Sequence, residues 1–509
     1  MTLNSSPFNL RDYFFGSERL ARIKDNTAIE YCGEKITYDA LSKLVHFYGG
    51  QLRERRIAQG DRVALLLYDS PIFITCFFAA ASIGAICVPV NTALSPDDVN
   101  FIIRDSGARL VIYEEDLKAK LDSIPDSIEI NAKDRYCLNA EINRATNQES
   151  HTVTTQESPA FMLYTSGSTG TPKGALHRHD AIPYTVESYS ANVLRLTEQD
   201  RIYSSSRLFF AYGLGNSLSF PLAAGACVLL DSERPSPARI AKIFKEQKPT
   251  VFFGVPAVYG ALLDFHASNP LDVSSLRLCV SAGEALPARI FEDWRRELGL
   301  TILDGIGSTE MLHIFISNSE VDARTGSSGK IVTGYEARLV DDSGNKVSTN
   351  ELGNLWVKGG SATTGYWNRP ELTQETVQEG WVKTGDIYRC DEEGFYYHVG
   401  RSDDCFKVRG LWVSPIEVES ALLAHEAVAE AAIVSAVGRD GLATVRAFVV
   451  IRQEGDGEKI KSELRDFAGS RLAKYKVPSE IVLIDEMPRT STGKIQRFKL
   501  RAEPQRRNE

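Results

Sequence analysis

The chain has 509 residues, of which 43% are hydrophobic and 25% are charged, and its formal net charge is −9 at pH 7. This composition is typical of a globular protein and excludes disordered and fibrous classes, and the length is enough for several domains. The acidic balance gives no basic surface for nucleic acid, so no partner of that kind is expected.

The eight cysteines are scattered along the chain without a CxxC pair. This spacing indicates neither a zinc site nor a disulfide framework, and a reducing compartment suits it best. The first fifteen residues, MTLNSSPFNLRDYFF, lack the basic region and apolar core of a cleaved signal peptide. We therefore expect a cytoplasmic protein.

Strands and helices are expected to alternate between Asp61 and Ile112. Continuous apolar runs predict strands at 63–67, 85–90 and 110–112, with helices at 72–83 and 96–106 between them. Apolar strands separated by helices are typical of a parallel sheet covered on both faces.

Residues 72–90 are apolar over almost the length that spans a bilayer. Ser82 and Gly84 divide this stretch into a helix-like part and a strand-like part, and Pro89 and Asn91 close it. A buried helix followed by a strand of a parallel sheet has the same hydropathy. We interpret the stretch as soluble core and expect no association with a membrane.

The segment from Tyr164 to Gly174, YTSGSTGTPKG, follows the apolar run 160–163 and is named here the phosphate loop. Glycines let backbone N–H groups turn toward an anion, hydroxyls add donors, and Lys173 supplies a positive charge. The pattern is not that of the P-loop NTPases, because Pro172 replaces the second glycine. A flexible linker is the alternative, which the preceding strand-like run disfavours. The candidate phosphate-binding residues are Thr165, Ser166, Gly167, Ser168, Thr169, Gly170 and Lys173.

A second run of strands and helices follows the phosphate loop. The pattern predicts helices at 181–194 and 257–265 and strands at 228–230, 250–253, 276–281 and 301–303. After Gly329, short strands and glycine turns, as in 337–340 and 355–358, indicate a small β-rich subdomain.

A domain boundary is expected near residues 400–404, because GRSDD is polar and begins with glycine. Beyond it, helix patterns at 416–424 and 458–472 alternate with strand patterns at 431–435 and 445–451. We predict a large domain over residues 1–402 and a small domain over residues 403–509, which is a usual domain size.

Six motifs occur in order along the chain: the phosphate loop, SAGEALP at 281–287, DGIGSTE at 304–310, TGD at 384–386, GRSDDCFKVRG at 400–410 and PRTSTGKIQR at 488–497. With them the chain resembles the adenylate-forming acyl-CoA synthetase superfamily from near the N-terminus to about Leu500. The resemblance implies an α/β fold, with a large domain of two α/β subdomains and a small β-rich subdomain, followed by a mobile α+β domain. It also implies ATP, Mg²⁺ and coenzyme A, in a monomer or homodimer.

The implied activity has two half-reactions, in which an acid first exchanges one oxygen for AMP and a thiol then displaces the AMP. Lys173 and the loop hydroxyls would hold the β- and γ-phosphates, and Thr309 would contact phosphate. Glu310 would hold Mg²⁺, whose charge offsets that of the leaving pyrophosphate. Lys494 would neutralise charge between the acid carboxylate and the α-phosphate. Taken alone, a Thr-Glu pair is more often a helix cap, and an exposed lysine is an ordinary surface residue.

The resemblance assigns the ribose hydroxyls to Asp386, with Arg401 as a second contact. Taken alone, the sequence TGD would indicate only a turn. The family often has an aromatic residue at the position of Ile306, which offers adenine an apolar face instead of a stacking ring. The other AMP-binding residues implied are Gly283, Glu284, Asp304, Gly305, Gly307 and Thr309.

Two segments, LFFAYGLGN at 208–216 and MLHIF at 311–315, resemble the benzoate–CoA ligase type more closely than the fatty acyl type. The implied acid is a benzoate, anthranilate or hydroxybenzoate, whose ring needs a flat, short, apolar slot. His313 would hydrogen-bond the carboxylate or an ortho substituent of the acid. The alternative is a buried histidine with partners inside the protein. Aromatic residues taken alone are more often part of a hydrophobic core. The candidate aryl-binding residues are Phe210, Ala211, Tyr212, Gly213, His313 and Ile314.

Free coenzyme A needs cationic groups for its phosphates, and Arg409, Lys474 and Lys476 are the candidates. Gly410 would let pantetheine pass close to the backbone, and Asp403 is the candidate hinge. One alternative is an enzyme that loads a carrier protein, and the lack of a recognisable carrier domain favours CoA. Another is a non-catalytic nucleotide sensor, which the complete set of catalytic candidates disfavours.

Overall fold

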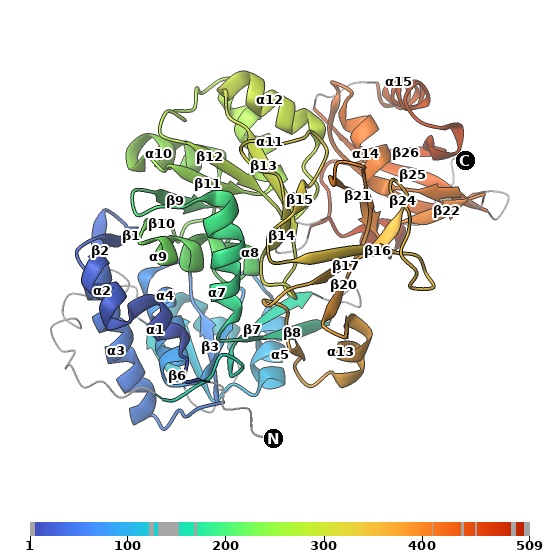
Figure 1. Cartoon of the computed structure of the whole chain (residues 1–509). Helices are drawn as coiled ribbons and strands as arrows, with labels where there is room; N and C mark the ends of the chain where they lie inside the picture. Colours follow the sequence, from blue (N-terminus) through green and yellow to red (C-terminus); the bar gives the residue numbers. More distant parts are fainter. Residues whose placement is uncertain are drawn as a thin grey trace.

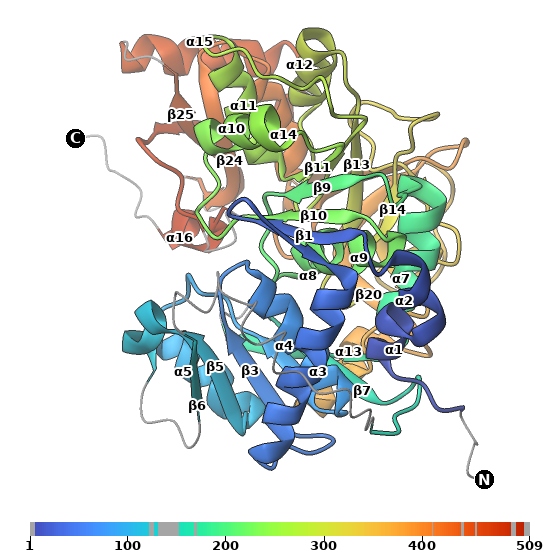
Figure 2. The same ribbon diagram turned by 90° about the vertical axis from the view of Figure 1, so that its left-hand side faces the viewer.

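The computed structural model describes residues 6–121, 127–130, 152–166, 171–409, 411–438, 442–452, 456–489 and 495–502. They form a large N-terminal part, drawn from blue to gold in Figure 1, and a small C-terminal part, drawn orange and red, at one end of it. In Figure 2 the sheet that contains β9, β10 and β1 lies above the sheet that contains β3, β5 and β6. The fold is mixed α/β, as predicted.

The sheet that carries the phosphate loop has seven strands in the order β18-β8-β7-β4-β3-β5-β6. β3 (Arg62–Leu66) pairs in parallel with β4 (Ile86–Pro89) and β5 (Leu110–Glu114). The connecting helices α4 (Pro71–Ser82) and α5 (Pro96–Ser106) pack into different hydrophobic clusters, so both faces of the sheet are covered. The predicted βαβαβ unit is therefore confirmed. The other strands are β6 (Ser127–Ile130), β7 (Pro159–Ser166), β8 (Pro172–Arg178) and β18 (Gly365–Tyr366).

Every residue of α4 is buried, in agreement with the interpretation of 72–90 as core. Among the described residues, none of the helices has the length and apolar character needed to cross a membrane.

The second sheet has nine strands in the order β15-β14-β13-β12-β11-β9-β10-β1-β2. Its edge is the N-terminal hairpin of β1 and β2. β1 pairs in parallel with β10, although six of the seven strands of the first sheet lie between them in the sequence. The sequence patterns did not predict this pairing. The strands are β1 (Thr27–Tyr31), β2 (Glu34–Thr37), β9 (Arg201–Ser204), β10 (Cys227–Leu230), β11 (Val251–Gly254), β12 (Leu278–Ser281), β13 (Ile302–Gly307), β14 (Ile314–Ser317) and β15 (Lys330–Ile331).

The remaining helices of the large part surround these two sheets. They are α1 (Leu10–Phe15), α2 (Ser17–Ile23), α3 (Tyr38–Glu54), η1 (Glu115–Lys120), α8 (Ala211–Leu214), η3 (Gly215–Ser219), α9 (Phe220–Ala224), α10 (Pro237–Gln247), α11 (Pro256–His266) and α12 (Ala288–Leu298). The predicted helix 181–194 begins as α7 (Ala181–Thr185) and continues as the π-helix η2 (Val186–Leu194). Hydrophobic spacing does not separate the two helix types over so short a stretch.

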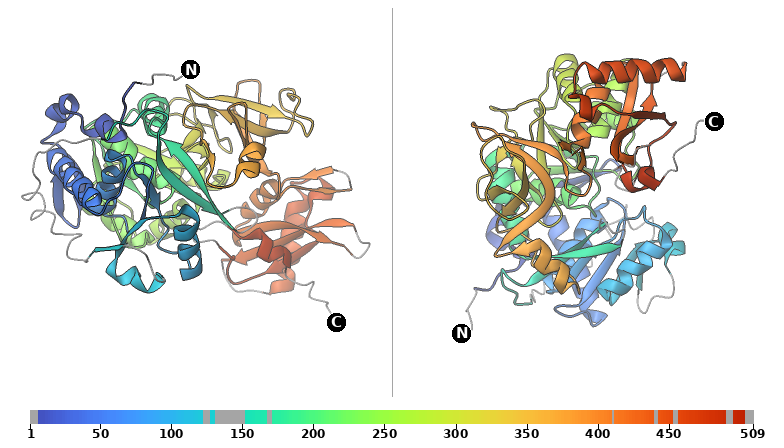
Figure 3. Two further views of the ribbon diagram at one scale, coloured as in Figure 1. Left: turned by 90° about the horizontal axis from the view of Figure 1, so that it is seen from below. Right: turned by 90° about the vertical axis from the view of Figure 1, so that its right-hand side faces the viewer.

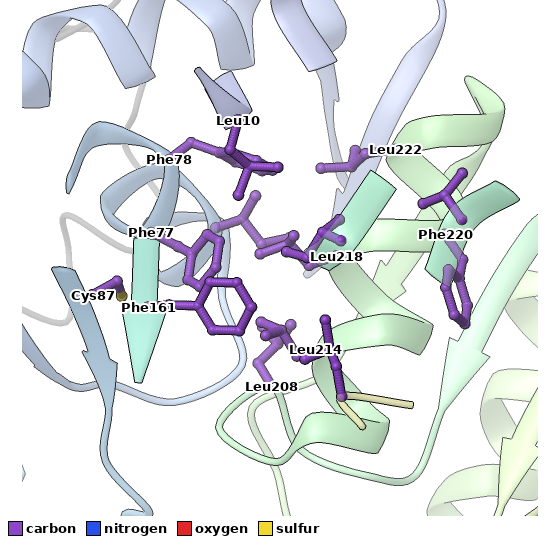
Figure 4. Packing of buried hydrophobic residues seen from close by; sticks show 14 of the residues in the cluster. Leu10, Phe77, Phe78, Cys87, Phe161, Leu208, Leu214, Leu218, Phe220 and Leu222 are labelled. Carbon is purple, nitrogen blue, oxygen red and sulfur yellow. The ribbon is translucent and has the colours of Figure 1, made fainter. Parts of the chain in front are cut away.

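The two sheets share one hydrophobic core. Figure 4 shows Phe77 and Phe78 of α4 and Phe161 of β7 facing Leu214 of α8 and Leu218 of η3. All five side chains are buried. Because burial of apolar surface is the main stabilising term, the two α/β subdomains are held together as one unit.

The small β-rich subdomain is confirmed. Its sheet runs β16-β17-β20-β19, with β21 also paired to β20. The elements are β16 (Glu336–Val340), β17 (Gly353–Lys358), α13 (Pro370–Thr376), β19 (Val377–Gln378), β20 (Trp381–Cys390) and β21 (Tyr396–Arg401).

The C-terminal part has a hydrophobic core of its own, as expected of a separate domain. Contact with the large part includes an ion pair of 3.0 Å between Arg452 and Asp264, and Figure 3 shows this part beside the large one in two further views. The boundary at 402/403 stays a prediction. The elements are β22 (Phe406–Val408), β23 (Leu411–Val413), α14 (Pro415–Leu423), β24 (Val428–Val437), β25 (Ala443–Ile451), α15 (Gly457–Gly469), η4 (Lys474–Lys476), β26 (Glu480–Leu483) and α16 (Arg497–Ala502).

Candidate active site

The phosphate loop joins two strands of one antiparallel hairpin. Thr165 of β7 pairs with Lys173 of β8, and Ser166 pairs with Pro172. A Cβ on Gly174 would lie 2.4 Å from the Met162 sulfur, so only glycine fits there. The interpretation as a free linker is therefore wrong. Four predicted phosphate-binding residues, Gly167, Ser168, Thr169 and Gly170, lie outside the described residues.

Lys173 and Glu310 meet at the hydroxyl of Tyr366, a residue that the sequence analysis did not single out. The Lys173 ammonium donates to this hydroxyl at 2.7 Å, and the hydroxyl donates to Glu310 Oε1 at 2.5 Å. Lys173 Nζ and Glu310 Oε1 are 3.9 Å apart. Two candidates that lie far apart in the sequence are thus brought together by a third side chain.

The electrostatics of this cluster follow from burial and from the nearby Arg401. Burial lowers the pKa of Lys173, the Glu310 charge opposes this, and the Arg401 charge adds to it. Burial raises the pKa of Tyr366, and the neighbouring Glu310 carboxylate raises it further. The phenol therefore keeps its proton.

Thr309 precedes Glu310 in the turn between β13 and β14, and buried groups fix the backbone there. The Thr309 carbonyl lies 2.9 Å from His177 Nε2, and the Glu310 carbonyl accepts from the Thr363 N–H at 2.7 Å. His177 is fully buried and its ring stacks on Phe161 at 5.1 Å. The buried core thus fixes the backbone from which the Thr309 and Glu310 side chains extend.

Asp386 and Arg401 are direct cross-strand partners on β20 and β21. Arg401 Nη1 lies 3.4 Å from Asp386 Oδ1, and it donates to the Thr384 carbonyl at 2.8 Å. Burial alone would raise the pKa of Asp386, but His398 and Arg401 lower it overall. Asp386 is therefore an ionised acceptor, the form that two ribose hydroxyls would need.

The other residues of the predicted AMP site follow β12 or lie within β13. Gly305, Ile306 and Gly307 pair with β14, and a Cβ on Gly307 would lie 2.6 Å from the His313 carbonyl oxygen. Gly283 has a φ of 100°, which favours glycine. Burial raises the pKa of Asp304 well above its usual range.

The predicted aryl-binding segment is tightly constrained. Phe210 precedes the short helix α8, which contains Ala211, Tyr212 and Gly213. A Cβ on Gly213 would lie 2.0 Å from the Arg207 carbonyl oxygen, so the backbone folds back on itself here. The Tyr212 hydroxyl donates to main-chain carbonyls of β11 and β12 at 3.3 and 3.2 Å.

His313 is buried beside this segment, next to Ile314 of β14. Its ring lies 5.5 Å from the ring of Tyr212 and 4.5 Å from that of Phe220. Nε2 lies 3.1 Å from Asn216 Oδ1, and Nδ1 has no hydrogen-bond partner among the described residues. Burial lowers the pKa of His313 to about 3, so the imidazole is neutral. Its role toward an acid remains a prediction.

A second residue that the sequence analysis missed, Asp69, supports the aryl-binding segment from the first sheet. This buried carboxylate accepts from the Leu208 N–H at 3.1 Å and lies 3.7 Å from Arg207 Nη1. A lone aspartate after a strand carries no sequence signal for this contact.

We expect Asp69→Asn to raise the KM for the acid by up to about tenfold, because a hydrogen bond to a charged group is weakened. The KM for ATP should stay within twofold of wild type. Steady-state kinetics with each substrate varied in turn would check this, with Asp116→Asn, an exposed carboxylate bonded to Tyr68 at 3.1 Å, as control. Equal changes in both KM values would contradict a local role.

The candidate CoA-side residues lie in the small part. Arg409 is exposed, with a φ of 52°, and Lys474 is exposed, whereas the Lys476 ammonium bonds both oxygens of Glu417 at 2.6 and 2.7 Å. Gly410 and Lys494 lie outside the described residues.

The proposed hinge residue Asp403 lies two residues after the end of β21, and Arg401 Nε lies 3.6 Å from its carboxylate. Nearby, Arg497 of α16 bonds Glu419 at 2.8 and 3.0 Å and lies 3.7 Å from Asp404. Burial alone would lower the pKa of Arg497, but nearby carboxylates raise it overall. Glu419 has the largest effect among them, and Glu284 of the large part has a smaller one. Arg497, three residues after Lys494, is therefore within electrostatic reach of Glu284, a residue of the predicted AMP site.

Two protein-family models match the chain. Residues 17–367 match the AMP-binding enzyme family, and residues 417–494 match the AMP-binding enzyme C-terminal domain.

Similar proteins span almost the whole chain. A benzoate–CoA ligase of Thauera aromatica is 40% identical over 97% of this chain and 96% of its own length. An anthranilate–CoA ligase of Pseudomonas aeruginosa is 36% identical over 97% and 96%. The crystal structure of the anthranilate CoA ligase AuaEII with anthranoyl-AMP has a TM-score of 0.91 at 37% identity, over 97% of this chain and 96% of that one. The chain therefore belongs to the AMP-binding enzyme family, the adenylate-forming superfamily that includes the aryl-CoA ligases.

Proposed function

We propose that this protein is an AMP-forming acid–thiol ligase that converts an aromatic carboxylic acid, of the benzoate, anthranilate or hydroxybenzoate type, into its CoA thioester. The observation that carries the proposal is the convergence of Lys173, Glu310, Asp386 and Arg401 at one place. The benzoate–CoA ligase and the anthranilate–CoA ligase described above are named for acids of this type, and each matches almost the whole of this chain.

In the first half-reaction, a carboxylate oxygen of the acid attacks the α-phosphorus of ATP, and the bond to pyrophosphate breaks. Lys173 binds the β- and γ-phosphates, while Asp386 accepts hydrogen bonds from the ribose hydroxyls. Lys494 neutralises charge between the carboxylate and the α-phosphate. Fixed cations placed where charge develops lower the barrier without reorganisation.

Magnesium fits this site by the chemistry of its donors. Glu310 offers a carboxylate oxygen beside the bound phosphates, and Mg²⁺ is usually held by one or two carboxylates together with substrate phosphates and water. When bound, the ion would offset charge on the leaving pyrophosphate.

In the second half-reaction, the CoA sulfur attacks the acyl carbon, the bond to AMP breaks, and the thiol proton passes to solvent. One surface cannot easily present both Lys494 and a pantetheine channel to the same carbon. We therefore propose that the small domain rotates about Asp403, which would bring Gly410 to the site. Arg409, Lys474 and Lys476 supply cations for the CoA phosphates.

The test is a panel of acids assayed for pyrophosphate release with ATP, with and without CoA. We expect benzoate or an amino- or hydroxybenzoate to be activated with a kcat/KM at least about 100-fold above that for hexanoate, because a short planar slot penalises a flexible chain. Thioester should accumulate only when CoA is present. Comparable kcat/KM for octanoate and benzoate would contradict the aryl assignment, and adenylate formation without transfer to CoA would favour a carrier protein as acceptor.

A further inference from the structure

Tyr366 lies on a two-residue strand, β18, that reaches the phosphate-loop sheet from almost 200 positions later in the chain. Gly365 and Tyr366 pair antiparallel with Leu176 and Ala175 of β8. This register places the Tyr366 ring beside Lys173, whose ammonium nitrogen is 4.0 Å from the ring centroid. The ring is thus a cation–π partner as well as the carrier of the bridging hydroxyl.

The backbone around Tyr366 is fixed on both sides. The Tyr366 N–H donates to Thr373 Oγ1 at 2.9 Å, and the Trp367 N–H donates to the Gly174 carbonyl at 2.8 Å. Gly365 has a φ of 139°, and a Cβ there would lie 2.6 Å from Thr373. Tyr366 therefore has little freedom to move away from Lys173.

One carboxylate, that of Asp105 at the end of α5, joins this strand to the start of the phosphate loop. Asp105 Oδ1 accepts from Arg369 at 2.7 Å, and Oδ2 accepts from the Tyr164 hydroxyl at 2.7 Å. Its main-chain carbonyl accepts from the Trp367 indole at 3.2 Å. The position of Tyr366 relative to the loop is thus set by a partly buried network of several hydrogen bonds.

The bridging hydroxyl lies between the opposite charges of Lys173 and Glu310, which attract each other across it. Lys173 and Glu310 are 3.9 Å apart, and the phenol satisfies one ammonium proton and one carboxylate oxygen. An ammonium has three donors, and a carboxylate has a second oxygen. As far as the described residues show, two donors of Lys173 and one oxygen of Glu310 are left for further partners.

We propose that Tyr366 is a positioning residue that keeps Lys173 and Glu310 from closing into a direct ion pair, so that both remain directed at the β- and γ-phosphates of ATP and their metal ion. The proposal rests on the proposed function. The proposed role of Tyr366 is specific to ATP, because AMP lacks the β- and γ-phosphates that Lys173 and Glu310 would hold.

Tyr366→Phe removes only the hydroxyl and keeps the ring over Lys173. We expect the variant to bind a non-hydrolysable ATP analogue with Mg²⁺ about tenfold more weakly in calorimetry, and AMP within twofold of wild type. The adenylation half-reaction should lose a similar factor in kcat/KM for ATP, while the KM for the acid and the transfer from supplied acyl-adenylate to CoA remain unchanged.

The matched control is Tyr397→Phe, which removes a hydroxyl bonded to the Asp391 carboxylate at 3.1 Å elsewhere in the large part. It should bind the analogue and AMP as wild type does. Unchanged binding of the analogue by Tyr366→Phe would overturn the proposal, and so would equal weakening of AMP or a large drop in the unfolding temperature, which would indicate a general structural role. A wild-type protein that binds the analogue but adenylates no aryl acid would refute the proposed function instead.

Discussion

Lys494→Ala is expected to slow acyl-adenylate formation by about a thousandfold, which corresponds to about 4 kcal/mol of barrier. The reason is the loss of the only charge that the proposed mechanism places between the acid carboxylate and the α-phosphate, two anions that must approach each other in this step. Lys494→Arg should restore only part of the rate, since guanidinium is broader and is not an equivalent point charge.

The same variant should transfer a supplied acyl-adenylate to CoA at close to the wild-type rate, because that step needs no lysine at the α-phosphate. Pyrophosphate exchange measures the first half-reaction, and thioester formation from synthetic acyl-adenylate measures the second. Lys499→Ala, which removes an exposed lysine of α16, is the control and should leave both intact. Equal loss of the two half-reactions would contradict the assignment of Lys494.

At acidic pH this protein should lose more stability than protonation of its carboxylates alone would cause. Burial lowers the pKa of His177 and His179 to about 4 and that of His313 to about 3. A histidine with a lowered folded-state pKa takes up its proton more readily in the unfolded chain. Stability is therefore complete above about pH 6.5 and is lost as the pH falls toward the folded-state values, by roughly 2–3 kcal/mol per histidine at pH 4.5.

His179→Gln tests this most cleanly, because His179 lies outside the proposed site and uses Nδ1 to accept from the Leu10 N–H at 3.0 Å. Glutamine can accept a hydrogen bond but cannot take the proton. Urea unfolding at pH 7.5 and 4.5 should show a loss of stability that is smaller in the variant by roughly 2 kcal/mol. The same loss in both proteins would show that His179 makes no contribution to acid unfolding.

Prediction from sequence succeeded where a local pattern carried the information. The runs around Val63 and Val111 are apolar throughout because their strands are buried on both faces, and helix 96–106 begins and ends at its predicted residues. The apolar run before the phosphate loop forms β7 as expected, and the role of the loop toward phosphate stays a prediction.

Prediction failed where the information lies in distant contacts. In the sequence, Tyr366 cannot be told from any other aromatic residue, because its place depends on the pairing of β18 with β8. Asp69 likewise carries no signal, because its role depends on the contact with Arg207. Neither pairing leaves a periodic signal, because each depends on tertiary packing. The charged partners of Lys476 and Arg497 were missed for the same reason.

The pairing of β1 with β10 also has a consequence for how the protein is made. At roughly 5–20 residues per second, the ribosome releases the N-terminal hairpin roughly 10–40 s before β10 emerges. During that interval the edge of β1 that later pairs with β10 is exposed. Closing the long segment between the two strands then costs conformational entropy. Six of the seven strands of the first sheet, β3 to β8, emerge in the meantime, so the nascent chain passes through a stage in which β1 is paired with β2 alone.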